Sequence, residues 1–448
     1  MTTRIRRFIL LSLSLLLPGA MSSDLRAADA GAVLGDGQNA LKTEYEVRAP
    51  IWTKLLNGDV ADPANPQHQQ AVDTAAKWAT FRLTWGSEKD PAKIGDTLRI
   101  SDVVREFGDN LQTIRGAREK GQKTGEMFIK QVIVHGLEVM QWRGPVARIN
   151  GARLLARIPE QGVSESQAEV LARLAGTNQG DLADAYATII KDPAQIDAAR
   201  LYAFRGLRFL LALPPQTPPA LPRDKEEAAV GAVVKFLQDR NKAPAPGTPQ
   251  EEIDGYRYVR REAIQALAQC RYPTLADKTH TTWLLLKVAA RDDIHPEPRI
   301  DERVEAAIGV THALPDFDKD YQPDYAAHQL GLFVVDFGAR YIQAKQLGAE
   351  DAALPWKVEA SRLIEGLELM KAQSQKNAHV ARVVDESLKL LTKIEKALQP
   401  NPSDLEQVLQ TEASPSQQLY KGDANTVVKP ANRKDAAEPV KPEEKKDK

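Results

Sequence analysis

Three alternating aspartates form the local pattern in this chain that comes nearest to a metal site. Asp316, Asp318 and Asp320 stand at every second position, and carboxylates spaced in this way converge on Ca²⁺ in the first half of a calcium-binding loop. The second half is missing, because Tyr321 stands where the turn needs glycine and Ala327 stands where a bidentate glutamate belongs. We therefore expect an acidic loop between helices, and the sequence predicts no metal or cofactor.

Other motifs that carry chemistry are absent from the sequence. There is no zinc-binding H-E-x-x-H, no paired C-x-x-C, no phosphate-binding P-loop and no serine nucleophile elbow. Gly35 to Ala40 has the spacing of a dinucleotide-binding loop but leaves no room for the strand that must precede one. The single cysteine, Cys270, stands at an apolar position of a repeat described below, which predicts a small buried side chain.

Composition excludes two classes of protein. The 448 residues include 60 lysines and arginines against 61 aspartates and glutamates, so the chain lacks the basic surplus that binds a nucleic-acid backbone. Its mean hydropathy of -0.40 excludes a membrane protein with several spanning helices. The chain is long enough to bury a large core, and one cysteine cannot form an internal disulfide.

The first thirty residues have the pattern of a secretory signal peptide. A basic start at Arg4, Arg6 and Arg7 precedes the apolar run Phe8 to Leu17, and Pro18 then interrupts the run. The run is about half the length that a membrane-spanning helix needs. We expect residues 1–30 to be a signal peptide cleaved between about residues 22 and 30. The mature chain would then lie in the periplasm or outside the cell, without a transmembrane helix.

Apolar residues recur at helical spacing from about residue 40 to residue 399, which predicts an all-α protein. Residues 31–140 form an N-terminal helical region with expected helices over 67–85, 100–121 and 124–142. The stripe of Trp78, Phe81 and Trp85 in the first of these has the chemistry of a sugar-binding platform, but at helical spacing it favours a core face. Residues 128–134 and 332–337 are rich in strand formers, yet each lies within a longer helical pattern.

A pattern repeats within residues 141–320. Its arginines are 52, 60 and 43 residues apart, and each is followed by small residues and an aliphatic residue at steps of three and four. Such steps place these positions on one helix face, where small residues allow a neighbouring helix to approach closely. Four segments align without gaps: Ala147-Arg148 to Ile158, Ala199-Arg200 to Leu210, Val259-Arg260 to Cys270 and Glu302-Arg303 to Ala313.

These segments resemble the second helix of HEAT-type repeats, with residues 259–267 the closest match, and an armadillo-like variant stays open. The resemblance implies an α-solenoid of stacked antiparallel helix pairs, in which Arg148, Arg200, Arg260 and Arg303 are structural positions. In that family an aspartate six positions before the arginine joins a hydrogen-bond ladder along the stack. Asp254 holds this place for Arg260 and Glu297 substitutes for it before Arg303, while the other two segments have no acidic residue there.

The remaining segments complete the expected organisation. Proline-rich stretches at 214–219 and 243–247 are expected to be loops between helices. Residues 321–399 should form a C-terminal helical cap with helices over 323–345, 355–375 and 378–398. From residue 400 the chain becomes rich in lysine, glutamate and proline, and such a segment buries too little apolar surface to fold, so residues 400–448 are expected to be a disordered tail.

Two functions fit this organisation. The first is an exported scaffold that uses its helical-repeat surface to hold a protein or glycan of the cell envelope, with self-association as a further option. The alternative is an all-helical glycan-active enzyme or other hydrolase whose carboxylate pair is hidden among the acidic residues. The absence of a recognisable site favours the scaffold, and the near-neutral charge argues against a nucleic-acid partner.

Overall fold

The computed structural model describes residues 37–86, 93–94, 98–117, 119–142, 144–160, 178–212, 221–314, 321–347, 354–398 and 402–413. The expected signal peptide, the calcium candidate at Asp316, Asp318 and Asp320, and the proline-rich stretch at 214–219 lie outside these residues. The part of the tail from residue 414 onward also lies outside them.

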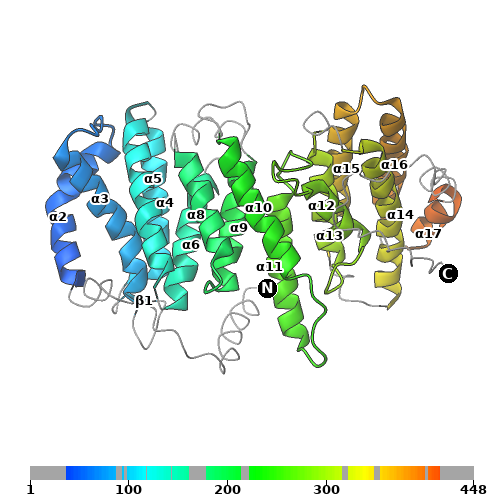
Figure 1. Cartoon of the computed structure of the whole chain (residues 1–448), viewed down its shortest axis with the longest axis horizontal. Coiled ribbons are helices and arrows are strands. Elements are labelled where there is room, and N and C mark those ends of the chain that lie inside the picture. The colour runs from blue at the N-terminus through cyan, green and yellow to red at the C-terminus, as the bar shows by residue number, and fades with distance from the viewer. Residues whose placement is uncertain are drawn as a thin grey trace, which may run out of the picture.

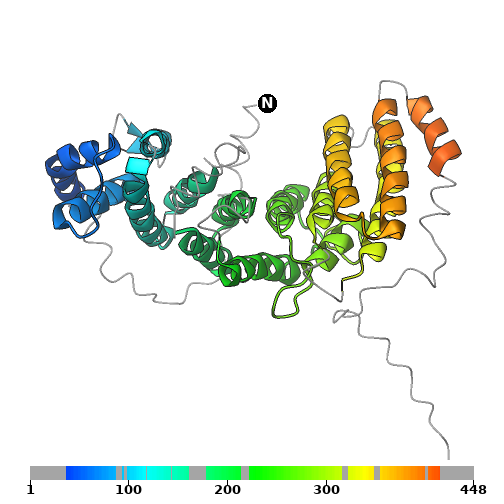
Figure 2. The same ribbon diagram turned by 90° about the horizontal axis from the view of Figure 1, so that it is seen from above.

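The described residues form an all-α protein, as predicted, in which helices stack side by side into a crescent (Figures 1 and 2). The only strands among these residues are β1 (Lys93–Ile94) and β2 (Leu98–Arg99), a short antiparallel ribbon that pairs Lys93 with Arg99 and Ile94 with Leu98. Residues 128–134 and 332–337 are helical, so helical periodicity outweighed their strand-forming composition. None of the described helices has the length and apolarity that crossing a membrane requires.

The N-terminal helical region begins the stack. Asn65 caps its second helix, with its side chain accepting a hydrogen bond from the backbone N–H of Gln67, and Pro66 occupies the first helical turn, where a missing N–H costs nothing. The helices of this region pack α2 on α3 and α3 on α5. Their bounds are α2 (Gly37–Leu56), α3 (Pro66–Phe81), the 3₁₀-helix η1 (Arg82–Thr84), α4 (Ile100–Gly116) and α5 (Glu119–Met140).

Helix pairs continue the stack through the repeat region. The second helix of each pair carries one of the aligned segments, and the loop over residues 243–247 lies between two helices as expected. The pairs are α5 with α6 (Pro145–Glu160), α8 (Gln179–Lys191) with α9 (Asp197–Leu211), α10 (Arg223–Asp239) with α11 (Gln250–Leu267), and α12 (Thr281–Ala290) with α13 (Ile300–His312).

The C-terminal cap extends further along the chain than the sequence predicts. Its helices are α14 (Pro323–Leu347), α15 (Trp356–Gln373) and α16 (Ala378–Ala397), and α16 packs on both of the others. Beyond residue 400, where a disordered tail was expected, α17 (Pro402–Val408) and the π-helical turn η5 (Leu409–Ala413) pack on this cap. Leu405 is fully buried, which gives this polar segment the apolar anchor that its composition conceals.

The second helices form the inner row of the crescent. We use the term second-helix row for the second helices α6, α9, α11 and α13 together with α15 of the C-terminal cap, each of which packs on the next. The first helices do not form such a continuous row, because α10 and α12 make little contact. The second helices stay in contact along the stack while the first helices separate, so the stack curves toward the second helices. The second-helix row therefore lines the concave side of the crescent (Figure 2).

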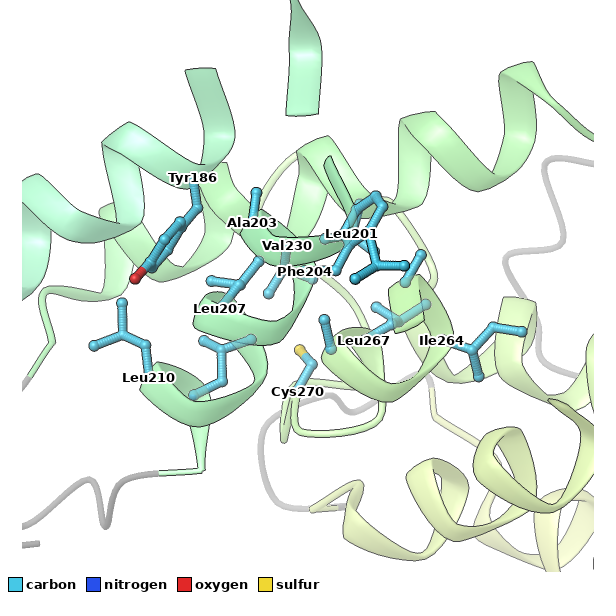
Figure 3. Close-up of a cluster of buried hydrophobic side chains, with 14 of the residues drawn as sticks. Tyr186, Leu201, Ala203, Phe204, Leu207, Leu210, Val230, Ile264, Leu267 and Cys270 are labelled. Carbon is cyan, nitrogen blue, oxygen red and sulfur yellow. The ribbon is translucent and has the colours of Figure 1, made fainter. Parts of the chain in front are cut away.

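The core lies between the two rows and uses the positions that the repeat predicts. Leu155, Leu207, Leu267 and Val310, at the equivalent aliphatic position of the four segments, have no exposed surface. Figure 3 shows the middle of this core, where Phe204 and Leu207 of α9 meet Val230 of α10 and Leu267 of α11. Burial of these aliphatic side chains is the main source of stability in a chain without disulfides.

Small residues of the repeat let helices approach closely. A Cβ atom on Gly206 would lie 2.5 Å from the ring of Tyr186, and one on Gly309 would lie 2.7 Å from the backbone of Ala268. Tyr186 is fully buried, and its hydroxyl donates a hydrogen bond to the carbonyl of Leu155 at 2.8 Å. The space left by the two glycines is therefore filled by neighbouring helices, as the three-residue spacing of small residues indicates.

Candidate binding surface

All four repeat arginines bind backbone carbonyls; Arg148, Arg200 and Arg303 lie in the first turn of their helices, whereas Arg260 lies in the middle of α11. Arg200 donates through Nη2 to the carbonyl of Asp192 at 2.6 Å and through Nε to that of Ile190 at 3.3 Å. Arg303 donates through Nε to the carbonyl of Ala289 at 2.8 Å. These carbonyls end the first helix of the same pair, where backbone acceptors lack helical partners, so both arginines join the two helices of a pair.

The other two repeat arginines reach the next pair. Arg148 donates to the carbonyl of Ala194 at 2.9 Å, and Arg260 donates to that of Pro296 at 2.7 Å. Both carbonyls belong to the loop inside the following helix pair. The four arginines thus serve as structural positions in two ways, within pairs and between pairs.

Acidic partners of these arginines come from places other than the sixth position before them. Asp254 accepts hydrogen bonds from Gln250 and Arg257, both on its own helix, while the carboxylate that binds Arg260 is Glu302 of α13. The ladder that the resemblance implies for Asp254 is therefore replaced by a direct bond between α11 and α13. The packing of α13 on α11 explains the change, because it brings the Glu302 carboxylate within hydrogen-bond distance of Arg260.

The two remaining acidic partners also differ from the expected pattern. Arg303 pairs at 2.5 Å with Asp336 of α14, so its carboxylate comes from the first helix of the C-terminal cap. Arg200 pairs at 2.8 Å with Asp197, three residues before it, and Asp197 also receives both Nη atoms of Arg240 at 2.6 and 2.8 Å. The bonds of Asp197 link the end of α10 to the start of α9, whereas Asp336 lies in the middle of α14.

A second set of charged side chains crosses the second-helix row. Arg205 of α9 donates to Glu262 of α11 at 2.6 and 3.0 Å, and Arg208 donates to Gln265 one turn further on. Gln265 and Arg261 of α11 both donate to Glu305 of α13. We call the full set the arginine–carboxylate network: Arg205, Arg208, Arg261, Glu262, Gln265, Asp301, Glu305, Glu359 and Arg362.

The network continues onto α15 and is layered by depth. Arg362 of α15 donates to both oxygens of Glu305, at 3.0 and 2.7 Å, and to Glu359 at 2.8 Å. The side chains of Glu305 and Glu359 are 4% and 9% exposed, whereas those of Arg261 and Arg362 are 29% and 37% exposed. Carboxylates therefore form the buried layer, and the guanidinium groups lie above them at the surface.

Burial and the arginines act in opposite directions on two of these carboxylates. Burial alone would raise the pKa of Glu305, but hydrogen bonds and attraction from Arg362, with Gln265 and Arg261, outweigh it and lower the pKa. For Glu359 burial prevails and raises the pKa, reinforced by the charge of Glu305. Two neighbouring carboxyl groups whose pKa values shift in opposite directions are typical of a catalytic pair in which one acts as acid and the other as base. Here both are nearly buried and held by arginine, which favours a structural network.

Tyrosines accompany the arginines of this surface. The hydroxyl of Tyr258 on α11 accepts a hydrogen bond from Nη2 of Arg205 at 2.9 Å, and the side chain of Tyr258 is among the large apolar groups that remain half exposed. The guanidinium of Arg205 also lies 5.6 Å from the ring centre of Tyr202 on α9. Arginine beside tyrosine is the composition that protein interfaces favour over other surfaces.

The remaining candidates from the sequence are structural or lie outside the described residues. Burial raises the pKa of Cys270 to about 12, which makes it a poor nucleophile. Trp78 stacks on Tyr45 at 4.6 Å and contacts the Arg82 guanidinium at 4.4 Å, so its ring is already partnered. Within the described part of the chain, no group of three or more histidine, cysteine, aspartate or glutamate side chains is placed to hold a metal ion.

Comparison of the chain with protein-family models, with curated proteins and with solved structures finds no match in any of the three. The helical-repeat architecture therefore rests on the helices of this chain and their packing.

Reasoning from the sequence missed the arginine–carboxylate network. Its hydrogen bonds between helices join residues 40 to 57 positions apart, as in the bonds of Gln265 with Glu305 and of Arg205 with Glu262. The repeat alignment contains a usable signal, because Glu262 and Glu305 each stand two positions after a repeat arginine. Charges at equivalent positions of successive second helices are the feature that could have indicated the network.

Proposed function

We propose that this protein is a HEAT-type scaffold of the cell envelope that holds a protein or glycan partner on its second-helix row. The observation that carries this proposal is the arginine–carboxylate network, which runs from α9 to α15 without a break. Hydrogen bonds between charged groups on successive helices fix these helices relative to one another. The concave side thereby gains a rigid, extended surface suited to a long partner.

The layering of the network supports binding at this surface. Buried carboxylates hold Arg205, Arg261 and Arg362 in place, so less side-chain entropy is lost when a partner binds them. The half-exposed ring of Tyr258 adds apolar contact area beside the guanidinium of Arg205. Arginine and tyrosine are the residues that most often dominate binding energy at interfaces.

The HEAT-type assignment is supported by the arginine and small residues at equivalent positions of four second helices. The envelope location is supported by the basic and apolar pattern of residues 4–17. N-terminal sequencing of the protein recovered from its producing cell tests the location. A start between about residues 23 and 31 is expected, and a start at Met1 or Thr2 would contradict export.

Retention of a partner by matched variants tests the binding function. The mature protein is used as bait on a detergent extract of its own envelope fraction, beside Tyr258→Asp on the second-helix row and Val134→Asp on α5. Both side chains are about half exposed, so each change adds one negative charge at a surface without opening the core. We expect the partner to be retained by the wild type and Val134→Asp and lost from Tyr258→Asp. Equal retention by all three would refute a site on the second-helix row.

A further inference from the structure

The arginine–carboxylate network follows a register that the repeat defines. The donor stands five positions after two of the repeat arginines, at Arg205 in α9 and at Gln265 in α11. The acceptor stands two positions after the next repeat arginine, at Glu262 in α11 and Glu305 in α13. Arg205 donates to Glu262 at 2.6 Å and Gln265 donates to Glu305 at 2.5 Å, so the register holds at two successive junctions.

At the junction of α6 and α9, the acceptor position of this register holds no carboxylate. The donor position five residues after Arg148 is Arg153, and the acceptor position two residues after Arg200 is Tyr202. Helix α6 packs extensively on α9, and the repeat alignment gives Arg153 and Tyr202 the positions that Arg205 and Glu262 hold one junction further on. The guanidinium of Arg153 forms no ion pair with any carboxylate among the residues whose positions the structure gives.

Positive charge accumulates at this end of the second-helix row. Helices α6 and α9 present Arg153, Arg157, Arg205 and Arg208 on successive turns. Among the described residues, the carboxylates bound to these four are Glu160, which pairs with Arg157, and Glu262 of α11. Arg208 is bound by the neutral amide of Gln265. An anionic group that approaches α6 and α9 therefore meets uncompensated guanidinium charge.

We propose that the partner is an acidic protein segment that places an aspartate or glutamate side chain at the junction of α6 and α9. This inference rests on the proposed binding function and names its partner chemistry. The carboxylate would accept hydrogen bonds from Arg153 and from the hydroxyl of Tyr202, as Glu262 accepts from Arg205. A peptide is favoured over other anions because the equivalent positions at the next two junctions are filled by glutamate side chains.

Binding of a fluorescein-labelled oligoglutamate peptide, followed by fluorescence anisotropy, tests the proposal on the full mature chain. Arg153→Gln should weaken binding about tenfold, the effect of losing one charge-assisted contact of about 1.4 kcal/mol. Arg105→Gln removes the same charge from the exposed surface of α4 and should leave the affinity unchanged. Equal affinity of Arg153→Gln and the wild type would overturn the proposal.

A second variant supplies the missing carboxylate from within the chain. Tyr202→Glu should place an acceptor beside Arg153, complete the register and abolish peptide binding, while circular dichroism and the melting temperature show an intact fold. Undiminished peptide binding by a folded Tyr202→Glu would overturn the proposal, as would tighter binding of an oligouronate than of the peptide at the same site. In one outcome, the wild type retains an envelope partner that Tyr258→Asp loses, while the peptide experiment fails. That combination would overturn this inference and leave the proposed function standing.

Discussion

Arg260 and Glu302 form a buried, two-pronged ion pair between α11 and α13. Nε of Arg260 lies 2.6 Å from one carboxylate oxygen of Glu302 and Nη2 lies 3.0 Å from the other, and the side chains are 3% and 1% exposed. Burial raises the pKa of Glu302, with Arg260 opposing this effect. Such a pair joins successive second helices only while both partners are present.

Removal of one partner should destabilise the protein strongly. Arg260→Met leaves the carboxylate of Glu302 buried without a counter-charge, and we expect a loss of about 3–5 kcal/mol. The double variant Arg260→Met with Glu302→Leu removes both charges and should recover most of that loss. Urea unfolding followed by circular dichroism measures both, and a single variant as stable as the wild type would show that the pair is not buried in solution.

Glycines at close helix approaches should be more sensitive than a glycine in open space. Gly309→Ala places a Cβ atom 2.7 Å from the Ala268 backbone, which can be accommodated only if α13 shifts, so thermal stability should fall clearly. Gly255 of α11 has no atom within 4 Å of the added Cβ, and Gly255→Ala should stabilise the helix by about 0.5–1 kcal/mol. The opposite ranking in melting temperature would mean that these helix contacts are misplaced.

Truncation of the equivalent aliphatic side chains should create cavities. Leu207→Ala and Leu267→Ala should each cost about 2–5 kcal/mol, because both side chains are fully buried between the two rows. Leu347 at the end of α14 is 72% exposed, and Leu347→Ala serves as the control with an expected loss below about 0.5 kcal/mol. Denaturant unfolding midpoints compare the three, and losses at Leu207 and Leu267 no larger than the control would contradict the assigned core.

His312 should contribute to loss of stability in mild acid. Burial lowers its pKa from 6.5, aided by Arg271 and opposed by the bond of Nδ1 to the carbonyl of Ala268. The folded protein therefore favours the neutral ring, so its stabilising contribution is complete above pH 6.5 and is lost as the pH falls through the lowered pKa. His312→Asn keeps a donor without a titrating ring, and its melting temperature should fall less between pH 7 and pH 5. A slope equal to that of the wild type would exclude His312 as a source of acid sensitivity.

The sequence predicted the helices and the core face well because both depend on local periodicity. Gly206 and Leu207 follow Arg200 by six and seven residues, and the same spacing places Ala266 and Leu267 after Arg260, all of them buried. The end of the fold was harder to predict, because the polar composition of the segment after residue 400 favours disorder and hides the short helix at its start. The apolar side chains that join the segment to the core, Leu405 with Val408 and Leu409, give a weak signal against the polar residues around them.

The polar contacts between helices depend on loop geometry, which local patterns do not contain. Arg200 reaches the end of its own first helix, whereas Arg148 and Arg260 reach the next loop, although all three occupy the same place in the alignment. The choice of Glu302 over Asp254 as the partner of Arg260 follows from how α13 is placed against α11. Hydrogen-bond and ion-pair partners on different helices could therefore be identified only from the arrangement of the helices in the structure.

The most direct test of the proposed function is cross-linking from the concave side in the cell that makes the protein. A photoreactive benzoylphenylalanine is placed at Tyr258 on the second-helix row or at Val134 on the first helix α5, both about half exposed. After irradiation, we predict an adduct of one defined mass from position 258 and none from position 134. The same adduct from both positions, or an adduct from position 134 alone, would contradict partner binding on the second-helix row.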